Sequence, residues 1–155
     1  MSEPRDTADK QINTDTINYY ETIYMKYYKS DITEKIIKCA FKVHNNLGNG
    51  FQEVVYQRAL AQEFKKEVLV FEREKEMTIY YGNQEIGRRR VDFLVDEDIM
   101  VELKAVTELK RVHSAQAINY IEAYNVKLAL LINFGSRRVE IRRFIKSDAS
   151  IRGNQ

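Results

Sequence analysis

The chain has 155 residues, 44% of them hydrophobic and 31% charged, which is the composition of one globular domain large enough to bury a core. A net charge of only +2 excludes a strongly basic nucleic-acid-binding protein, although it allows a local basic patch. A single cysteine excludes an internal disulfide and, without a Cys/His cluster, a zinc site is not expected either.

The first 30 residues are predicted to be a variable arm that precedes the folded domain. Residues 1–16 are polar and expected to be disordered or loosely attached. Residues 17–30 hold five of the ten tyrosines, so we expect them to pack on the body or on a second subunit of a homodimer. The polar start is unlike a signal peptide and no apolar run is long enough to span a membrane, which predicts a cytoplasmic protein without membrane contact.

Two helices are predicted next, over residues 31–47 and about 51–66. Apolar residues recur at helical spacing in both, and Gly48 supplies a stop after the first. Glu53 lies in the first turn of the second helix. An acidic residue there ordinarily favours the helix dipole, and its position alone leaves a catalytic role open.

Strands follow the helices. Residues 68–71 are predicted to form a short strand, and residues 77–81 and 85–95 to form two more. Gly82-Asn83 between the last two is typical of a type II′ hairpin turn.

Residues 91–105 form the centre of the prediction. Apolar and polar residues alternate on both sides of an acidic turn, which predicts a hairpin in which Val95 pairs with Ile99. The same register places Asp92 opposite Glu102. One face is expected to lie in the core, with Val91, Phe93, Val95, Ile99, Val101, Leu103 and Ala105.

The other face of this hairpin would bring Asp92, Glu102 and Lys104 together. Opposed residues lie about 4.5–5.5 Å apart at Cβ, and two carboxylates at that distance repel each other unless a cation lies between them. Carboxylate oxygens with open water positions suit Mg²⁺ or Mn²⁺, and Lys104 could polarise a bound water or stabilise charge on a phosphate. An ordinary solvated strand face is the alternative, and these residues alone leave it open.

Basic and polar residues surround this face in the predicted order of elements. Arg88, Arg89 and Arg90 alternate between two faces, so some could hold phosphates, or all could form a solvated edge. A helix is predicted over residues 112–124, where one face carries a polar set that could complete a pocket or lie on the surface: His113, Gln116 and Tyr120.

Strands predicted over residues 127–134 and 139–145 end the domain. The order α, α, strands, α, two strands predicts an α/β (α+β) domain over residues 31–147, with a mixed central sheet flanked by helices. The helix that joins the Glu102 strand to residues 127–134 makes those two strands parallel. Residues 148–155 are expected to be a polar tail.

Taken together, these motifs resemble the GxxExxY protein family, part of the PD-(D/E)XK superfamily of restriction-endonuclease-like nucleases. The resemblance runs from about residue 31 to residue 145 and implies a restriction-endonuclease-like core with a Mg²⁺-dependent phosphodiesterase site. The residues that carry it are Gly50, Glu53, Tyr56, Asp92, Glu102, Leu103, Lys104, His113, Gln116 and Tyr120.

The resemblance also implies a role for each site residue. Asp92 and Glu102 would bind the metal together with the backbone carbonyl of Leu103. Lys104 would position the attacking water, and Glu53 would be an additional carboxylate beside the metal. A Gln-x-x-x-Tyr motif, which supports the site or contacts DNA, would be formed by Gln116 and Tyr120.

We therefore expect a Mg²⁺- or Mn²⁺-dependent nuclease that acts on DNA rather than RNA. Arg88, Arg89, Arg90 and His113 are the expected nucleic-acid contacts. One alternative is a module that uses the same fold to bind nucleic acid or a partner protein without cleavage. A homodimer formed through residues 17–30 is a third possibility, and it is compatible with the nuclease.

Overall fold

The computed structural model describes residues 26–146, and the chain divides into a unit of residues 1–30 and a unit of residues 31–155. The predictions made for residues 1–25 and for the tail from residue 147 lie outside the described residues. Within the described part, no helix combines the length and the apolar character that crossing a bilayer requires.

The second unit is built from helices and one sheet, in the predicted α/β order. Its helices are α2 (Ser30–Leu47), α3 (Glu53–Lys66) and α4 (Arg111–Ala123). Its strands are β1 (Phe71–Tyr81), β2 (Gln84–Val95), β3 (Ile99–Lys104), β4 (Leu128–Asn133) and β5 (Glu140–Ile145).

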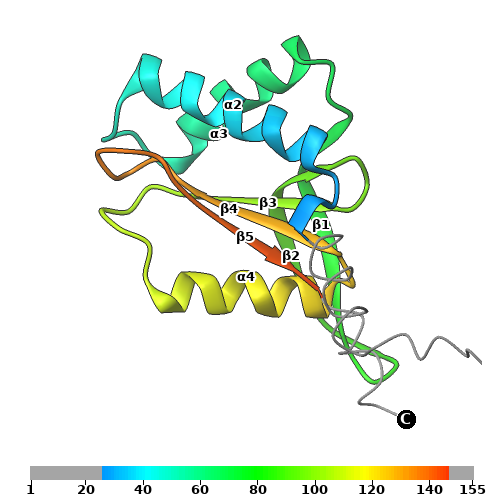
Figure 1. Ribbon diagram of the computed structural model, residues 1–155. Coiled ribbons are helices and arrows are strands. Elements are labelled where there is room, and N and C mark those ends of the chain that lie inside the picture. Colours follow the sequence, from blue (N-terminus) through cyan, green and yellow to red (C-terminus); the bar gives the residue numbers. More distant parts are fainter. Residues whose placement is uncertain (1–25, 147–155) are drawn as a thin grey trace, which may run out of the picture. The chain divides into compact units, whose positions relative to one another are not determined.

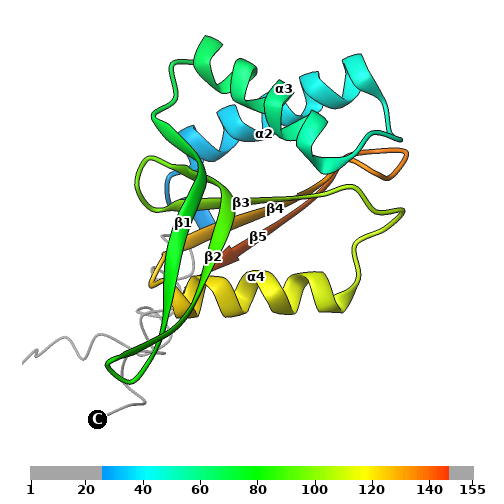
Figure 2. The same ribbon diagram turned by 180° about the vertical axis from the view of Figure 1, so that it is seen from behind.

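The sheet has the strand order β1-β2-β3-β4-β5 and is mixed, as predicted. Strands β3 and β4 are parallel and the other neighbours are antiparallel, which confirms the predicted crossover through α4. Helices α2 and α3 cover one face of the sheet and α4 covers the other (Figures 1 and 2). The fold class is therefore that of a restriction-endonuclease-like core.

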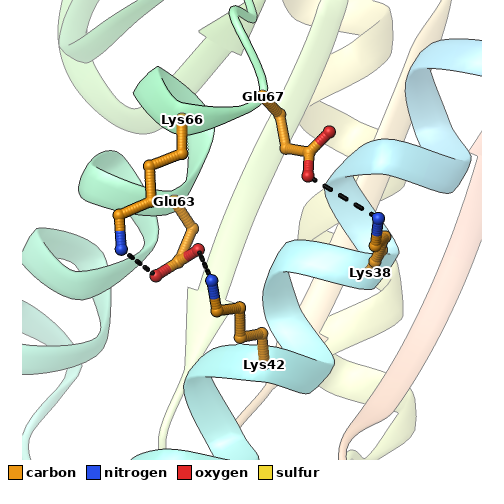
Figure 3. Close-up of polar contacts among 5 residues, drawn as sticks. All are labelled: Lys38, Lys42, Glu63, Lys66 and Glu67. Atoms are coloured by element: carbon orange, nitrogen blue, oxygen red, sulfur yellow. Dashed lines mark hydrogen bonds and ion pairs between the residues drawn. The ribbon is translucent and has the colours of Figure 1, made fainter.

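Ion pairs join the outer surfaces of α2 and α3 (Figure 3). The Glu63 carboxylate lies 2.9 Å from the Lys42 ammonium of α2 and 3.0 Å from Lys66 of its own helix. A longer pair, at 3.7 Å, joins Lys38 to Glu67. The lysines of these pairs are exposed, so packing of the helices on the sheet stabilises this layer more than its charges do.

The core lies on both sides of the sheet. On the α3 side, the buried Phe93 ring packs edge-to-face on Phe64 and Phe71, with ring centroids 5.0 and 5.7 Å away. On the α4 side, a second buried cluster includes Met100 of β3 and Ile121 of α4. Both layers consist of large apolar side chains that the period of the helices and strands places inward.

Val91 belongs to the α4-side cluster, so the prediction that it shares a face with Phe93 is wrong. The β1–β2 ladder pairs Arg73 with Phe93 and Lys75 with Val91 but does not pair Glu74 with Asp92, and Glu74 has a φ of 52°. An irregularity of this kind at one pair breaks the alternation of side chains along the strand.

The short strand predicted over residues 68–71 is also wrong. The backbone N–H groups of Val68 and Leu69 donate to Lys65 and Phe64 and end helix α3, and Val68 has a φ of 56°. One continuous strand then starts at Phe71. Residues 72–76, in the charged first half of this strand, were not predicted to be a strand. Charged side chains are tolerated on an edge strand because they face solvent.

The remaining turns agree with their sequence signals. Val95 pairs with Ile99, which confirms the predicted register at the tip of the β2–β3 hairpin. Tyr81 pairs with Gln84 across a two-residue turn in which Gly82 has a φ of 60°. Glycine tolerates that conformation and other residues rarely adopt it.

Candidate active site

The β2–β3 hairpin opens at Asp92 and Glu102. The ladder ends at the pair Phe93–Val101, one position before these two acids. Beyond it, Glu102 Oε1 accepts the backbone N–H of Asp92 at 3.1 Å, and Asp92 Oδ2 accepts the N–H of Leu103 at 2.8 Å. Each carboxylate thus takes a backbone donor of the opposite strand, and two negative side chains converge in one gap.

This gap holds Glu102 in an unfavourable electrostatic environment. The residue is only 6% exposed. Burial raises the pKa of its carboxyl to about 7, and the charge of Asp92 adds to the rise, while Arg89 and Lys104 oppose it. A carboxylate that is buried beside another one is stabilised by any cation that can reach both.

Glu53 approaches the same gap from the start of α3. Partial desolvation raises the pKa of its carboxyl; the nearby Lys104 ammonium opposes this and Asp92 adds to it. Part of the side chain is still open to solvent. The structure therefore brings Glu53 into electrostatic contact with Asp92 and Lys104.

The start of α3 is held in place by Tyr56. Its hydroxyl donates to the Gly48 carbonyl at 2.6 Å and accepts the N–H of Phe51 at 3.3 Å. Its ring stacks on Phe134 with centroids 4.7 Å apart and planes 7° from parallel. Tyr56 is therefore a buried anchor that fixes the turn in which Glu53 lies.

Helix α4 contributes to the site from the other face of the sheet. Gln116 Oε1 lies 3.5 Å from the Lys104 ammonium. Tyr120 carries the guanidinium of Arg89 over its ring at 4.4 Å. Gln116 and Tyr120 thus face the hairpin, whereas His113 accepts the N–H of Lys110 through Nδ1 and caps the helix.

The three adjacent arginines have different surroundings. Arg88 is exposed and pairs with Glu85 and Glu76. Arg90 is also exposed. Arg89 is half-buried beside Tyr120, and within residues 26–146 its Nε has no hydrogen-bond acceptor. Of the three, Arg89 is the one that influences the charges of Glu53 and Glu102.

Two buried polar residues that support the site were missed in sequence. Gln57 donates from α3 to Asp92 Oδ1 at 2.8 Å. Asn133, at the end of β4, bonds both backbone groups of Val106 and so fixes the loop that follows Lys104. Sequence signals existed for both: Gln57 lies four residues after Glu53, and Asn133 interrupts an apolar strand.

Close packing at Gly135 completes this support. A Cβ atom at this position would lie 2.4 Å from backbone atoms of Ala105 and Val106. Glycine is required there because the turn after β4 passes directly over the loop after β3. The loop that follows Lys104 is thus fixed both by the Asn133 side chain and by the close backbone contact at Gly135.

The donor set fits a small, hard divalent cation. Within residues 26–146, no group of three His, Cys, Asp or Glu side chains is arranged to hold a metal by itself. Asp92 and Glu102 supply two carboxylates, and a backbone carbonyl such as that of Leu103 and water molecules would complete the oxygen ligands that Mg²⁺ or Mn²⁺ prefers. The repulsion within the acidic pair supports this fit.

The chain matches the sequence profile of the PD-(D/E)XK nuclease superfamily over residues 30–144. A solved structure described as the crystal structure of SSO0001 is 18% identical, with a TM-score of 0.46. That match covers 85% of this chain and 65% of the other, so this chain spans less than two thirds of it. Among curated proteins, none matches this chain.

Proposed function

This chain belongs to the PD-(D/E)XK nuclease superfamily, and from that premise we propose that it hydrolyses phosphodiester bonds of DNA with the help of Mg²⁺ or Mn²⁺. The convergence of Asp92 and Glu102 in the opened hairpin carries the proposal, because it leaves two carboxylates where one cation would relieve their repulsion. We also propose membership of the GxxExxY family, supported by Gly50, Glu53 and Tyr56.

The site residues then divide into metal ligands and residues that act on the attacking water or the phosphate. Asp92, Glu102 and the Leu103 carbonyl would hold the cation, and Glu53 would contribute through a water molecule. The bound ion would lower the pKa of a coordinated water toward neutral pH and so make it a better nucleophile. Lys104, whose ammonium lies 3.5 Å from Gln116 Oε1, aligns the attacking water or stabilises negative charge on the phosphate.

Arg89 is the proposed contact for a phosphate of the substrate. It lies near the acidic pair, and its guanidinium is supported by the Tyr120 ring. A guanidinium binds phosphate oxygens well. Arg88 already has two acidic partners and contributes less, while the exposed Arg90 and His113 are secondary contacts.

Cleavage of plasmid DNA, single-stranded DNA and RNA tests the proposal directly. DNA is expected to be cut with Mg²⁺ or Mn²⁺ and not with EDTA. Lys104→Ala and Asp92→Asn are each expected to lower the rate at least about 100-fold. Lys65→Ala, an exposed lysine of α3, is the matched control and keeps full activity.

Two results contradict this mechanism. Cleavage that persists in EDTA excludes a role for the cation. Cleavage that survives Lys104→Ala excludes the proposed role of the lysine. Salt-dependent DNA binding without any metal-dependent cleavage indicates a binding module instead.

A further inference from the structure

Gln57 is one of the few buried polar side chains in the part of the chain that the structure describes. It is 6% exposed, and the other buried residues of α3 are Tyr56, Leu60, Ala61 and Phe64. Burying an amide is unfavourable unless it is hydrogen-bonded, so a leucine or methionine would suit this helix face better. The position therefore needs an explanation other than packing.

The contact that Gln57 makes supplies one. Its Nε2 donates to Asp92 Oδ1 at 2.8 Å, while the N–H of Leu103 donates to Asp92 Oδ2 at 2.8 Å. The carboxylate is thus held through both oxygens, by a helix on one side and by the neighbouring strand on the other. Two donors from separate elements fix its rotamer where one would leave it free to turn.

The helix that carries Gln57 is itself fixed. Tyr56 anchors the start of α3 by its stack on Phe134 and its bond to Gly48. Glu53 and Gln57 are four residues apart and lie on one face of this helix. Helix α3 therefore brings both residues to Asp92 as a rigid unit.

We propose that Gln57 is a positioning residue that holds the Asp92 carboxylate ready for a divalent cation. The inference rests on the proposed function, because it presumes that Asp92 binds the ion. Residues that hold metal ligands in place from outside the coordination sphere typically change metal affinity 10–100-fold when replaced. Gln57 acts only through Asp92 and has no part in bond breaking.

Titration of Mn²⁺ into the metal-free protein by calorimetry tests this role. Gln57→Met removes the donor but keeps an unbranched side chain of similar length, and Gln62→Met, at an exposed glutamine of the same helix, is the control. We expect Gln57→Met to bind Mn²⁺ about 10–100-fold more weakly than the wild type and Gln62→Met to bind equally well. The melting temperature of metal-free Gln57→Met should change little, because the cost of burying the amide and the hydrogen bond to Asp92 are lost together.

The opposite pattern marks a merely structural glutamine. If Gln57→Met melts lower but binds Mn²⁺ as tightly as the wild type, the proposal is overturned while the nuclease proposal stands. If the wild type binds no Mn²⁺ at all, both proposals fail together.

Gln57→Asn decides the matter if the methionine variant does not fold. It keeps an amide on this helix face, but its side chain is one methylene shorter than the one that reaches Asp92. Mn²⁺ should raise its melting temperature by less than it raises that of the wild type, because weaker binding gives a smaller stabilisation. An equal or larger rise contradicts the proposal.

Discussion

At its tip the β2–β3 hairpin is a regular ladder, whereas at its base the same two strands separate and carboxylates take the place of backbone acceptors. The tip pairs are Phe93–Val101, Leu94–Met100 and Val95–Ile99. At the base, Glu102 and Asp92 accept the N–H groups that a continued ladder would have satisfied. Both halves satisfy the backbone donors, but only the base does so with carboxylate oxygens, which have further lone pairs that could bind a cation.

The difference shows how a stable sheet can carry an unstable site. The tip is apolar on both faces and is covered by α3 on one side and α4 on the other (Figures 1 and 2). The base keeps a buried acid, Glu102, whose ionisation opposes folding. Substitutions at the tip should therefore lower stability, and substitutions at the base should lower function while some raise stability.

The largest expected effect on stability comes from the tip. Phe93→Ala removes a fully buried ring that packs on Phe64 and Phe71, and should lower the free energy of unfolding by about 3–5 kcal/mol. Urea denaturation measures it. Tyr80→Ala, at a ring that is 60% exposed, is the control and should change little. A loss below about 1 kcal/mol for Phe93→Ala would show that the tip is not the stable half.

Glu102→Gln tests the base. It should raise the free energy of unfolding, whereas Phe93→Ala lowers it. The folded pKa of about 7 exceeds the ordinary 4.5, so the unfolded chain loses this proton first. Wild-type stability therefore falls as the pH rises from about 4.5 to 7 and then stays low. In EDTA at pH 8, Glu102→Gln should be the more stable protein, by on the order of 3 kcal/mol, and at pH 4 the two should be alike.

Unfolding in urea at the two pH values measures this difference. Gln84→Ala, at an exposed residue of β2, is the control, and its difference in stability from the wild type should be small and equal at both pH values. Glu102→Gln should also lose Mn²⁺ binding, which separates the function of this acid from its effect on stability. A variant that is less stable than the wild type at pH 8 contradicts the account of the base.

Much of the regular fold could be predicted from sequence because local rules determine it. Alternation around the acidic turn gave the Val95–Ile99 register, and a helix between two buried strands gave their parallel direction. The charged half of β1 could not be recognised, since its strand conformation depends on pairing with β2. Val91 lies on the α4 side of the sheet because the strand is irregular at Asp92, and the alternation of apolar residues in the sequence does not reveal that irregularity.

The candidate site divides in the same way. Asp92, Glu102 and Lys104 lie on one hairpin, so the sequence predicts their proximity, but the ladder ends one pair before the two acids and the predicted pairing of Asp92 with Glu102 does not form. The bond of Gln57 to Asp92 spans 35 positions, and that of Asn133 to Val106 spans 27. Contacts of this kind depend on how the helices and strands pack, and residue spacing alone does not reveal them.

The arginines beyond the base offer a third test, of smaller size. In an Asp92→Asn background that does not cut, Arg89→Gln should weaken DNA binding and reduce the slope of log affinity against log salt by about 0.9, the value for one phosphate contact on duplex DNA. Arg88→Gln removes an arginine already paired with Glu85 and Glu76, and should leave the slope unchanged. Fluorescence anisotropy at several salt concentrations measures both, and a larger change for Arg88→Gln would reverse the assignment.

The smallest effect is expected at Tyr120, whose ring supports Arg89 at 4.4 Å. A cation over an aromatic face is worth about 0.5–1 kcal/mol at a partly exposed site, so Tyr120→Leu should weaken DNA binding roughly 2–5-fold. Tyr120→Phe keeps the ring and should bind like the wild type. If the phenylalanine variant instead loses as much as the leucine variant, the hydroxyl is the functional group of Tyr120, and the base of the hairpin holds its arginine by another contact.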